Sequence, residues 1–382
     1  MQMGTSSDRS ASGVSSSQEQ LKKQRAPFSR MRGISFWVAL VLVASFLGLG
    51  VAVRRYNLAN DFAVGNVAFI ICAFFAGVTI VVWLSAFAFW GWRRLIPPLC
   101  LIALVALPIP FIKEVDGEMM PVFGWPFWSP DERLEVPPPV VENNEEEIPT
   151  IDLATATEDD FPNFLGPDMA QHVQGVELER DWQKHPPRLV WQQEIGAGWS
   201  AFATRNGYAV TMEQRGEHEL VTCYEIATGE LQWSHGVETR YETVLGGVGP
   251  RSTPTIDEQG RVFANGATGV LRCIDGNTGM LLWQVNLLKE LGISPERDAS
   301  AIVYGRSNSP LVVDNYVVVP GGESASLVAF DANTGELAWR GGKDQIAYAS
   351  PIVGELDGVR QIVSVNEASV TGHATDTGAV LW

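Results

Sequence analysis

Residues 330–339 read Phe-Asp-Ala-Asn-Thr-Gly-Glu-Leu-Ala-Trp, and this pattern returns along the second half of the chain. Near copies end at Trp233 and Trp283, and a degenerate copy, Thr-Gly-Ala-Val-Leu-Trp, occupies residues 377–382. The Thr-Gly pairs begin at positions 228, 278, 334 and 377, so they are spaced by 50, 56 and 43 residues. Repeats of about 40 to 50 residues that contain several short strands are typical of propeller blades.

Each copy predicts a β-hairpin. An apolar strand ends at Asp or Glu, and a Gly in the turn supplies the positive φ of a tight connection. The Trp then falls four residues after that Gly in every copy; these glycines are Gly229, Gly279, Gly335 and Gly378. Upstream, strand openings with a Pro near the start lie at residues 252–256, 309–313 and 350–353, where a missing N–H is tolerated. Four short strands per repeat predict an all-β propeller with four blades.

The hairpin pattern Ala-x-Asp-x-x-Thr-Gly-x-x-x-Trp, met in full by residues 329–339, resembles the repeats of the pyrroloquinoline quinone (PQQ) propeller superfamily. That superfamily includes quinoprotein alcohol and glucose dehydrogenases and the propeller lipoprotein of the outer-membrane assembly machinery. The lead-in at residues 161–167, Phe-Pro-Asn-Phe-Leu-Gly-Pro, is similar to that of PQQ-like propellers without an assigned activity. The resemblance covers residues 161–382. It implies that the repeat Trp residues dock one blade against the next; they are Trp233, Trp283, Trp339 and Trp382.

The sequence departs from the family pattern at several positions. Cys223 and Cys273 replace the Ala of the motif, and Ala374 stands where the Asp belongs. Residues 188–195 predict a fifth strand of the outer type, ahead of the first blade. We therefore expect an incomplete propeller, an open arc of four blades, rather than a closed ring in which the strand around Trp191 pairs with the strand that ends at Trp382.

The N-terminal third has a different composition. Residues 1–33 are polar, with six basic and two acidic side chains, and predict a disordered tail. Three apolar segments follow, at about 34–53, 63–92 and 95–112, each near the length that crosses ~30 Å of hydrocarbon. Pro97, Pro98, Pro108 and Pro110 near the ends of the third segment leave two spans as the alternative. The long polar leader without a small-residue cleavage site argues against a signal peptide.

Charges beside the spans predict the orientation. The basic residues of the tail place the N-terminus in the cytoplasm, although Arg54 and Arg55 on the opposite side count against this. With three spans, Arg93 and Arg94 are also cytoplasmic, and the propeller lies outside a multi-pass membrane protein, expected in the inner membrane. With two spans the propeller stays in the cytoplasm.

Residues 113–160 predict a linker, because fourteen acidic residues face only Lys113 and Arg133 and seven prolines interrupt the segment. Such a segment spaces a domain from a membrane; the alternative is an acidic docking tail for a basic partner. The formal net charge of −17 argues against nucleic acid as a partner, since nucleic acid attracts basic surfaces. The expected partners are the lipid bilayer and a protein bound through the propeller.

A ligand site, if the propeller has one, is expected where the first strands of the blades line the central channel. Arg251, Arg306, Asn308 and Tyr348 lie at or just before those strand openings. They are either blade-end residues that face water or an anchor for an anion, with a guanidinium suited to the carboxylates of PQQ. No calcium ligands or catalytic Asp of the dehydrogenases can be matched, and the five histidines show no spacing of metal ligands. Cys223 and Cys273 are interpreted as small buried residues rather than a disulfide.

These observations favour a membrane-anchored, extracytoplasmic PQQ-like propeller that acts as a binding or assembly module. The alternative is a membrane-bound quinoprotein alcohol or sugar dehydrogenase that uses PQQ with calcium, for which the sequence offers no adjacent Cys-Cys pair. A third class is a tethered receptor that reports a ligand through its spans. Binding and turnover of PQQ would separate the first two.

Overall fold

A computed structural model describes residues 35–56, 62–88, 91–115, 119–124, 134–138, 150–173, 175 and 177–382. The chain divides into two compact units, Met1–Pro126 and Phe127–Trp382. Each is considered by itself. The predicted tail at residues 1–33 and much of the predicted linker lie outside the described residues.

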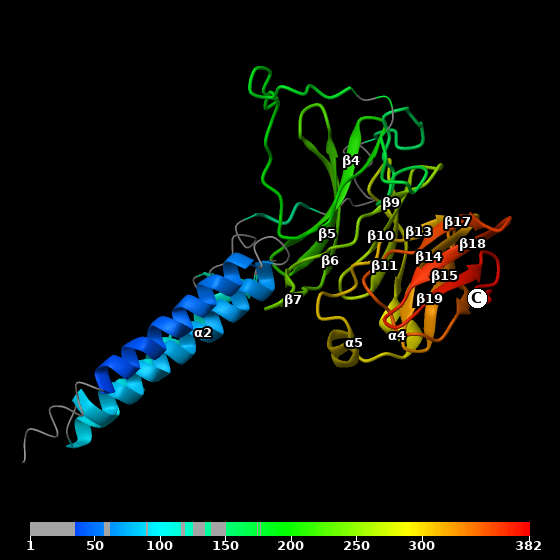
Figure 1. Cartoon of the computed structure of the whole chain (residues 1–382). Helices are drawn as coiled ribbons and strands as arrows, with labels where there is room; N and C mark the ends of the chain where they lie inside the picture. The colour runs from blue at the N-terminus through cyan, green and yellow to red at the C-terminus, as the bar shows by residue number, and fades with distance from the viewer. Residues whose placement is uncertain are drawn as a thin grey trace, which may run out of the picture. The chain divides into compact units, whose positions relative to one another are not determined.

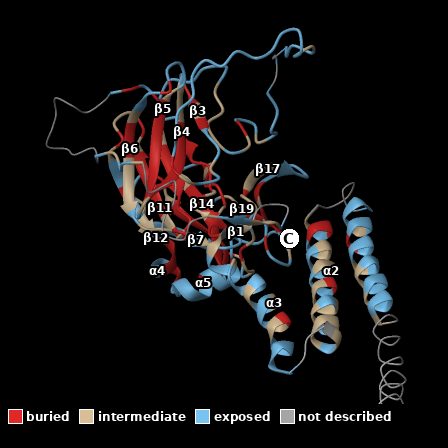
Figure 2. Ribbon diagram, turned by 90° about the vertical axis from the view of Figure 1, so that its left-hand side faces the viewer, coloured by how far each residue is buried: buried red, intermediate tan, exposed pale blue. Residues whose placement is uncertain are grey.

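The first unit contains three helices that are long and apolar enough to cross a membrane, as predicted: Ser35–Tyr56, Ala63–Phe87 and Gly91–Phe111. The second comprises α2 (Phe62–Trp83) and the π-helical turn η1 (Leu84–Ala88). The third comprises η2 (Gly91–Leu95), α3 (Ile96–Ala106) and η3 (Ile109–Phe111). Pro97 occupies the first turn of α3, where a missing N–H breaks no helical bond. Few residues of these three helices are buried (Figure 2), as is expected for helices surrounded by lipid.

A short hairpin that was not predicted ends this unit. Strand β1 (Ile112–Val115) pairs with β2 (Pro121–Phe123) in antiparallel register. Leu153, within the segment predicted as linker, is fully buried in the core of the second unit. The core of the propeller therefore begins ahead of residue 161.

The second unit is a propeller built from four antiparallel sheets (Figure 1), which confirms the predicted fold class. Blade 1 contains β3 (Ala203–Arg205), β4 (Tyr208–Arg215), β5 (His218–Glu225) and β6 (Leu231–Glu238). Blade 2 contains β9 (Thr255–Ile256), β10 (Arg261–Asn265), β11 (Val270–Asp275) and β12 (Leu281–Asn286). Blade 3 contains β13 (Leu311–Val313), β14 (Tyr316–Gly322), β15 (Ala325–Asp331) and β16 (Leu337–Gly341). Blade 4 contains β17 (Ile352–Leu356), β18 (Val359–Val365) and β19 (Val370–Ala374). The short pair β7 (Glu242–Thr243) and β8 (Gly247–Val248) joins blade 1 to blade 2.

The repeat hairpins explain the sequence motif. The Trp of each of the first three copies pairs across the sheet with the small residue of the motif: Trp233 with Cys223, Trp283 with Cys273 and Trp339 with Ala329. A β-bulge follows directly in each blade, so the turn begins at a defined place. A small side chain opposite the indole leaves room for the ring to lie flat between two blades.

Buried side chains join neighbouring blades into a continuous core. One cluster joins blades 1 and 2 around Met212 and Val262, and another joins blades 3 and 4 around Leu311 and Ile362. The strands β4 and β5 are almost wholly buried (Figure 2).

A buried ion pair also joins blades 1 and 2. The fully buried Glu219 carboxylate accepts from the Arg272 guanidinium at 2.7 Å. It also accepts from the Ala267 N–H at 2.8 Å, so both charges are compensated.

The prediction of a fifth outer strand was wrong, because residues 188–195 are all described and none of them is in a strand. Trp191 nevertheless packs on blade 1 and donates its Nε1–H to the Ile226 carbonyl at 2.8 Å. Within residues 177–382 no strand pairing joins β3 of blade 1 to blade 4, and the four blades do not close a ring. At the other end of the series, Trp382 is 53% exposed and turns back to donate to Gln361 Oε1 of its own blade at 2.6 Å.

The lead-in segment runs across the inner strands of the blades. Phe161 forms a β-bridge with Thr204 of blade 1, and the Pro162 carbonyl accepts from the Ile256 N–H of blade 2 at 2.8 Å. Met169 packs on the cluster between blades 3 and 4. The segment thus links all four blades, which gives a structural reason for its motif.

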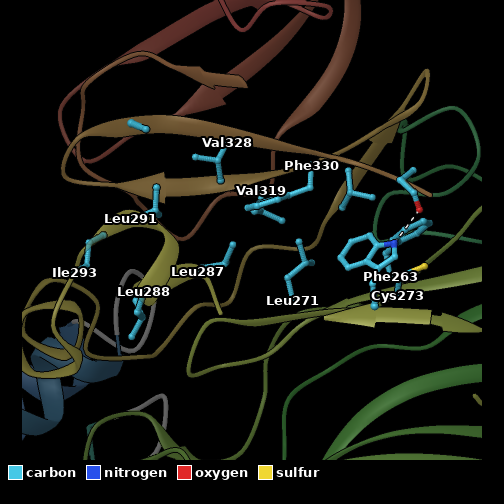
Figure 3. Packing of buried hydrophobic residues seen from close by; sticks show 14 residues of the cluster. Phe263, Leu271, Cys273, Leu287, Leu288, Leu291, Ile293, Val319, Val328 and Phe330 are labelled. Carbon is cyan, nitrogen blue, oxygen red and sulfur yellow. Dashed lines mark hydrogen bonds between the residues drawn. The ribbon is translucent and has the colours of Figure 1, made fainter. Parts of the chain in front are cut away.

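Two short helices separate blade 2 from blade 3 and account for the longest repeat spacing. They are α4 (Leu287–Leu291), capped by Asn286, and α5 (Pro295–Ala301), capped by Ser294. Figure 3 shows Leu287, Leu288 and Leu291 of α4 in the cluster that also holds Phe263 and Phe330 from blades 2 and 3. The helices lie at one end of the sheets (Figure 1), and we call this the helical end.

Candidate binding face

The four predicted channel residues lie at the helical end, in the segments that lead into the inner strands. Arg251 precedes β9, Arg306 and Asn308 precede β13, and Tyr348 precedes β17. The structure separates them into two pairs. One pair joins an exposed cluster of aromatic rings, and the other is buried between blades.

Arg251 and Tyr348 belong to the exposed group. The guanidinium of Arg251 lies over the rings of Trp199 and Tyr304, with its Cζ 5.1 and 5.5 Å from the two ring centroids. Tyr304 meets Tyr348 edge to face, with 5.3 Å between ring centroids. We call Trp199, Arg251, Tyr304 and Tyr348 the aromatic cluster. Its three aromatic residues are between 38% and 60% exposed, so it presents a partly apolar surface with one positive charge.

Hydrogen bonds below the aromatic cluster hold its loops in place. The Tyr241 hydroxyl donates to the Val303 carbonyl at 2.6 Å, and Thr243 Oγ1 donates to the same carbonyl at 3.0 Å. Arg251 donates to the Gly246 carbonyl. Burial raises the pKa of both Tyr241 and Tyr348. The two phenols therefore stay protonated near neutral pH and can donate hydrogen bonds.

Arg306 and Asn308 are buried and serve the packing of blades. Arg306 forms two hydrogen bonds with Asp298 of α5, at 2.8 and 3.2 Å, and donates to the Pro320 and Gly321 carbonyls of blade 3. Asn308 Nδ2 donates to the carbonyls of Ala347 and Ala349 at 2.9 and 2.6 Å. Arg306 thus fixes the helical insertion to blade 3, and Asn308 links blade 3 to the segment that leads into blade 4.

The family resemblance implies PQQ with calcium as a cofactor, and the residues of the aromatic cluster meet only part of what that cofactor needs. A guanidinium such as that of Arg251 suits a quinone carboxylate. Calcium, however, takes six to eight oxygen ligands, and the cluster contains no carboxylate. Nor do three His, Cys, Asp or Glu side chains gather anywhere in the described part of the chain as metal ligands would. The cluster does not fit a calcium-bound quinone, and the assignment of a cofactor to the four residues stays a prediction.

The two cysteines of the motif lie in different interblade clusters as free thiols. Burial raises the pKa of both, that of Cys273 to about 12. They are therefore held as neutral, unreactive thiols.

Trp199, Tyr241 and Tyr304 were not among the residues predicted from the sequence. Trp199 lies outside the repeat, and Tyr304 lies in the insertion that lengthens the second spacing to 56 residues. That spacing is the only signal in the sequence that points toward Tyr304. A longer loop on a repeated scaffold is where function is most often placed.

Comparison with known proteins agrees with the fold. Residues 188–382, just over half of the chain, match the family model described as outer membrane protein assembly factor BamB. Among solved structures, BamB from Moraxella catarrhalis is 18% identical with a TM-score of 0.32, covering 47% of this chain and 46% of that one. A quinohemoprotein alcohol dehydrogenase from Comamonas testosteroni is 14% identical with a TM-score of 0.39, covering 63% of this chain and 44% of that one.

The chain therefore spans less than half the length of these two structures. No curated protein matches the sequence. The family match and the four repeat hairpins lead to one conclusion: the chain belongs to the PQQ-repeat family whose model carries the description of the assembly factor BamB.

Proposed function

We propose that this protein is a membrane-anchored binding or assembly module whose propeller lies outside the cytoplasm. Three apolar helices supply the anchor. The basic tail favours a cytoplasmic N-terminus, and an odd number of spans then carries the propeller across an inner membrane to the periplasmic or outer side. The acidic segment between the β1–β2 hairpin and the buried Ile151 serves as a spacer between membrane and propeller.

The aromatic cluster is the observation that carries the binding role. Trp, Tyr and Arg are enriched among the residues that dominate binding energy at protein interfaces, and Trp and Tyr bury a large area at a small entropic cost. Here two tyrosines, a tryptophan and an arginine contact one another on an exposed surface. Arg306 and Asn308, the other two residues predicted for a ligand site, are engaged in hydrogen bonds between parts of the propeller. The family description, an assembly factor, supports the same role.

Position-dependent photo-crosslinking tests this function. Tyr304 is replaced by the photo-crosslinking residue p-benzoylphenylalanine in the full-length protein in its native membrane, and the same replacement is made at exposed Glu336 in the repeat turn. The proposal expects a discrete crosslinked protein from position 304 and none from position 336. Identical products from both positions, or none from position 304, would contradict a docking role for the aromatic cluster. Quinone-dependent turnover would instead support the dehydrogenase alternative.

A further inference from the structure

A pocket of about 500 Å³ lies at the helical end, next to the aromatic cluster. It falls within the usual size range of ligand sites. Three parts of the chain build it: the end of blade 1, the β10–β11 turn with β12 of blade 2, and the helical insertion. Its lining includes Val237, Glu238, Tyr241, Thr268, Asp298 and Ala299. Neither the sequence motifs nor the proposed function assigns a role to this pocket.

The lining combines aliphatic side chains with two carboxylates. Val237, Val270, Leu288 and Ile302 supply aliphatic surface. Two carboxylates, Glu238 and Asp298, also line the pocket, and the described residues that line it include no lysine or arginine. An anionic ligand would be repelled by the Glu238 carboxylate, whereas a cation with an aliphatic stem matches both the carboxylate and the aliphatic side chains.

The two carboxylates have different surroundings. Asp298 is almost buried and keeps its ion pair with Arg306 at 2.8 Å, so its charge is largely compensated. Glu238 is exposed at the end of β6. Glu238 is therefore the carboxylate that an incoming cation would meet.

Hydrogen bonds fix the pocket walls before any ligand binds. Thr239 Oγ1 and Thr268 Oγ1 lie 3.1 Å apart and join blade 1 to blade 2. The Tyr241 ring lies against Gly305, where an added Cβ would come within 3.0 Å of the ring. A pocket that is formed in advance loses little entropy when it is filled.

The net negative charge of the whole propeller also favours a cationic ligand. Residues 161–382 carry fifteen basic and twenty-seven acidic side chains. Such an excess raises the local concentration of cations and speeds their encounter.

From these observations we infer that the pocket receives a lysine or arginine side chain from a basic segment of the protein partner. The inference rests on the proposed binding role and adds the chemistry of the partner. The aliphatic stem lies against the aliphatic side chains of the lining, and the charged head reaches Glu238. The adjacent aromatic cluster then packs against the residues that flank the basic side chain.

Fluorescently labelled trilysine is the probe, titrated into the full-length protein in detergent micelles and followed by anisotropy. The acidic segment at residues 113–160 also attracts this probe, so matched variants decide the outcome. Glu238→Gln removes the carboxylate, and Glu336→Gln removes an exposed carboxylate outside the pocket. Ala299→Arg places a guanidinium at the exposed lining of the pocket, and Ala338→Arg adds the same charge on the exposed face of β16.

The inference predicts that Glu238→Gln weakens trilysine binding about two- to five-fold, the effect of one partly exposed ion pair. Ala299→Arg weakens binding by about ten-fold or more, because the new side chain fills the pocket and its charge repels the cationic probe. The two control variants change the dissociation constant by less than about two-fold, within the range of an exposed charge change. Equal effects of Ala299→Arg and Ala338→Arg, or no saturable binding by the unaltered protein, would overturn the inference.

Failure of this inference can be distinguished from failure of the proposed function. If Tyr304 still crosslinks to a partner while Ala299→Arg leaves trilysine binding unchanged, the binding role stands and the pocket is not its anchor. If quinone turnover is found and position 304 yields no crosslink, the binding role itself is wrong.

Discussion

The indole ring of Trp233 lies directly on Gly279, the turn glycine of the next blade. A Cβ added to Gly279 would come within 2.8 Å of Trp233, and the Trp233 Nε1–H donates to the Gly276 carbonyl at 2.7 Å. The same contact joins Trp283 to Gly335, where the Nε1–H donates to the Ala332 carbonyl at 3.1 Å. The Gly of the motif thus serves twice, since its φ near +75° forms the turn and its missing side chain admits the Trp of the preceding blade.

Replacing Trp233 with Ala should lower the free energy of unfolding of the propeller by about 3–5 kcal/mol. The ring is 2% exposed, and its loss leaves a cavity between blades 1 and 2 together with an unpaired Gly276 carbonyl. Urea denaturation measures the change. Trp182, which is 57% exposed, gives the matched control, and Trp182→Ala should cost little. Equal effects of the two substitutions would show that the indole does not join the blades.

Replacing Arg272 alone with Met should destabilise the propeller by about 3–5 kcal/mol, because the buried Glu219 carboxylate loses its counter-ion. Burial already raises the pKa of Glu219, and removal of the guanidinium raises it further. Replacing Glu219 with Leu at the same time should restore much of the loss. A double-mutant cycle by chemical denaturation checks this. Additive single effects would mean that the two side chains are not coupled.

The stability of the propeller should fall as the pH drops from about 6.5 to about 4. Burial, with a smaller effect of the Arg272 charge, lowers the pKa of His235 from 6.5 to about 4. In that window the unfolded chain binds a proton that the folded chain excludes, so acid favours unfolding by about 1–3 kcal/mol. His235→Gln should flatten this part of the profile of melting temperature against pH, whereas exposed His172→Gln should not. A profile that keeps its slope in His235→Gln would assign the effect to other groups.

A reporter fused after Asp160 should be active only outside the cytoplasm. In the proposed topology, three spans and a cytoplasmic tail would place that position across the membrane. Alkaline phosphatase and a cytoplasm-dependent fluorescent protein at the same site give opposite readouts. Activity of the cytoplasmic reporter alone would refute the orientation and leave the two-span alternative.

Local sequence patterns were sufficient to predict the blades. A bulge, a positive-φ Gly and a Trp at a fixed offset act within about ten residues, so the hairpins that end at Trp233, Trp283 and Trp339 could be located from sequence. The apolar helices are equally local. For both the hairpins and the helices, the residues that form the sequence pattern are the same residues whose local interactions form the structure.

The rest depends on contacts between distant residues. Trp191 docks on Gly229 as a repeat Trp would, with an added Cβ coming within 2.6 Å of its ring, yet residues 188–195 have no neighbouring strand to pair with. Arg306, like Arg251, was predicted at a strand opening of the channel, but its buried position follows from Asp298 in an insertion that no repeat encodes. The aromatic cluster likewise unites Trp199 with Tyr304, which are far apart in the chain.

Titration of the purified full-length protein with PQQ in the presence of calcium, followed by an assay of alcohol- and sugar-dependent dye reduction, tests the central claim most directly. The account of a binding module predicts no saturable quinone binding and no turnover, because the aromatic cluster lacks the carboxylates that calcium requires. Saturable binding accompanied by substrate-dependent dye reduction would contradict it and identify a quinoprotein dehydrogenase.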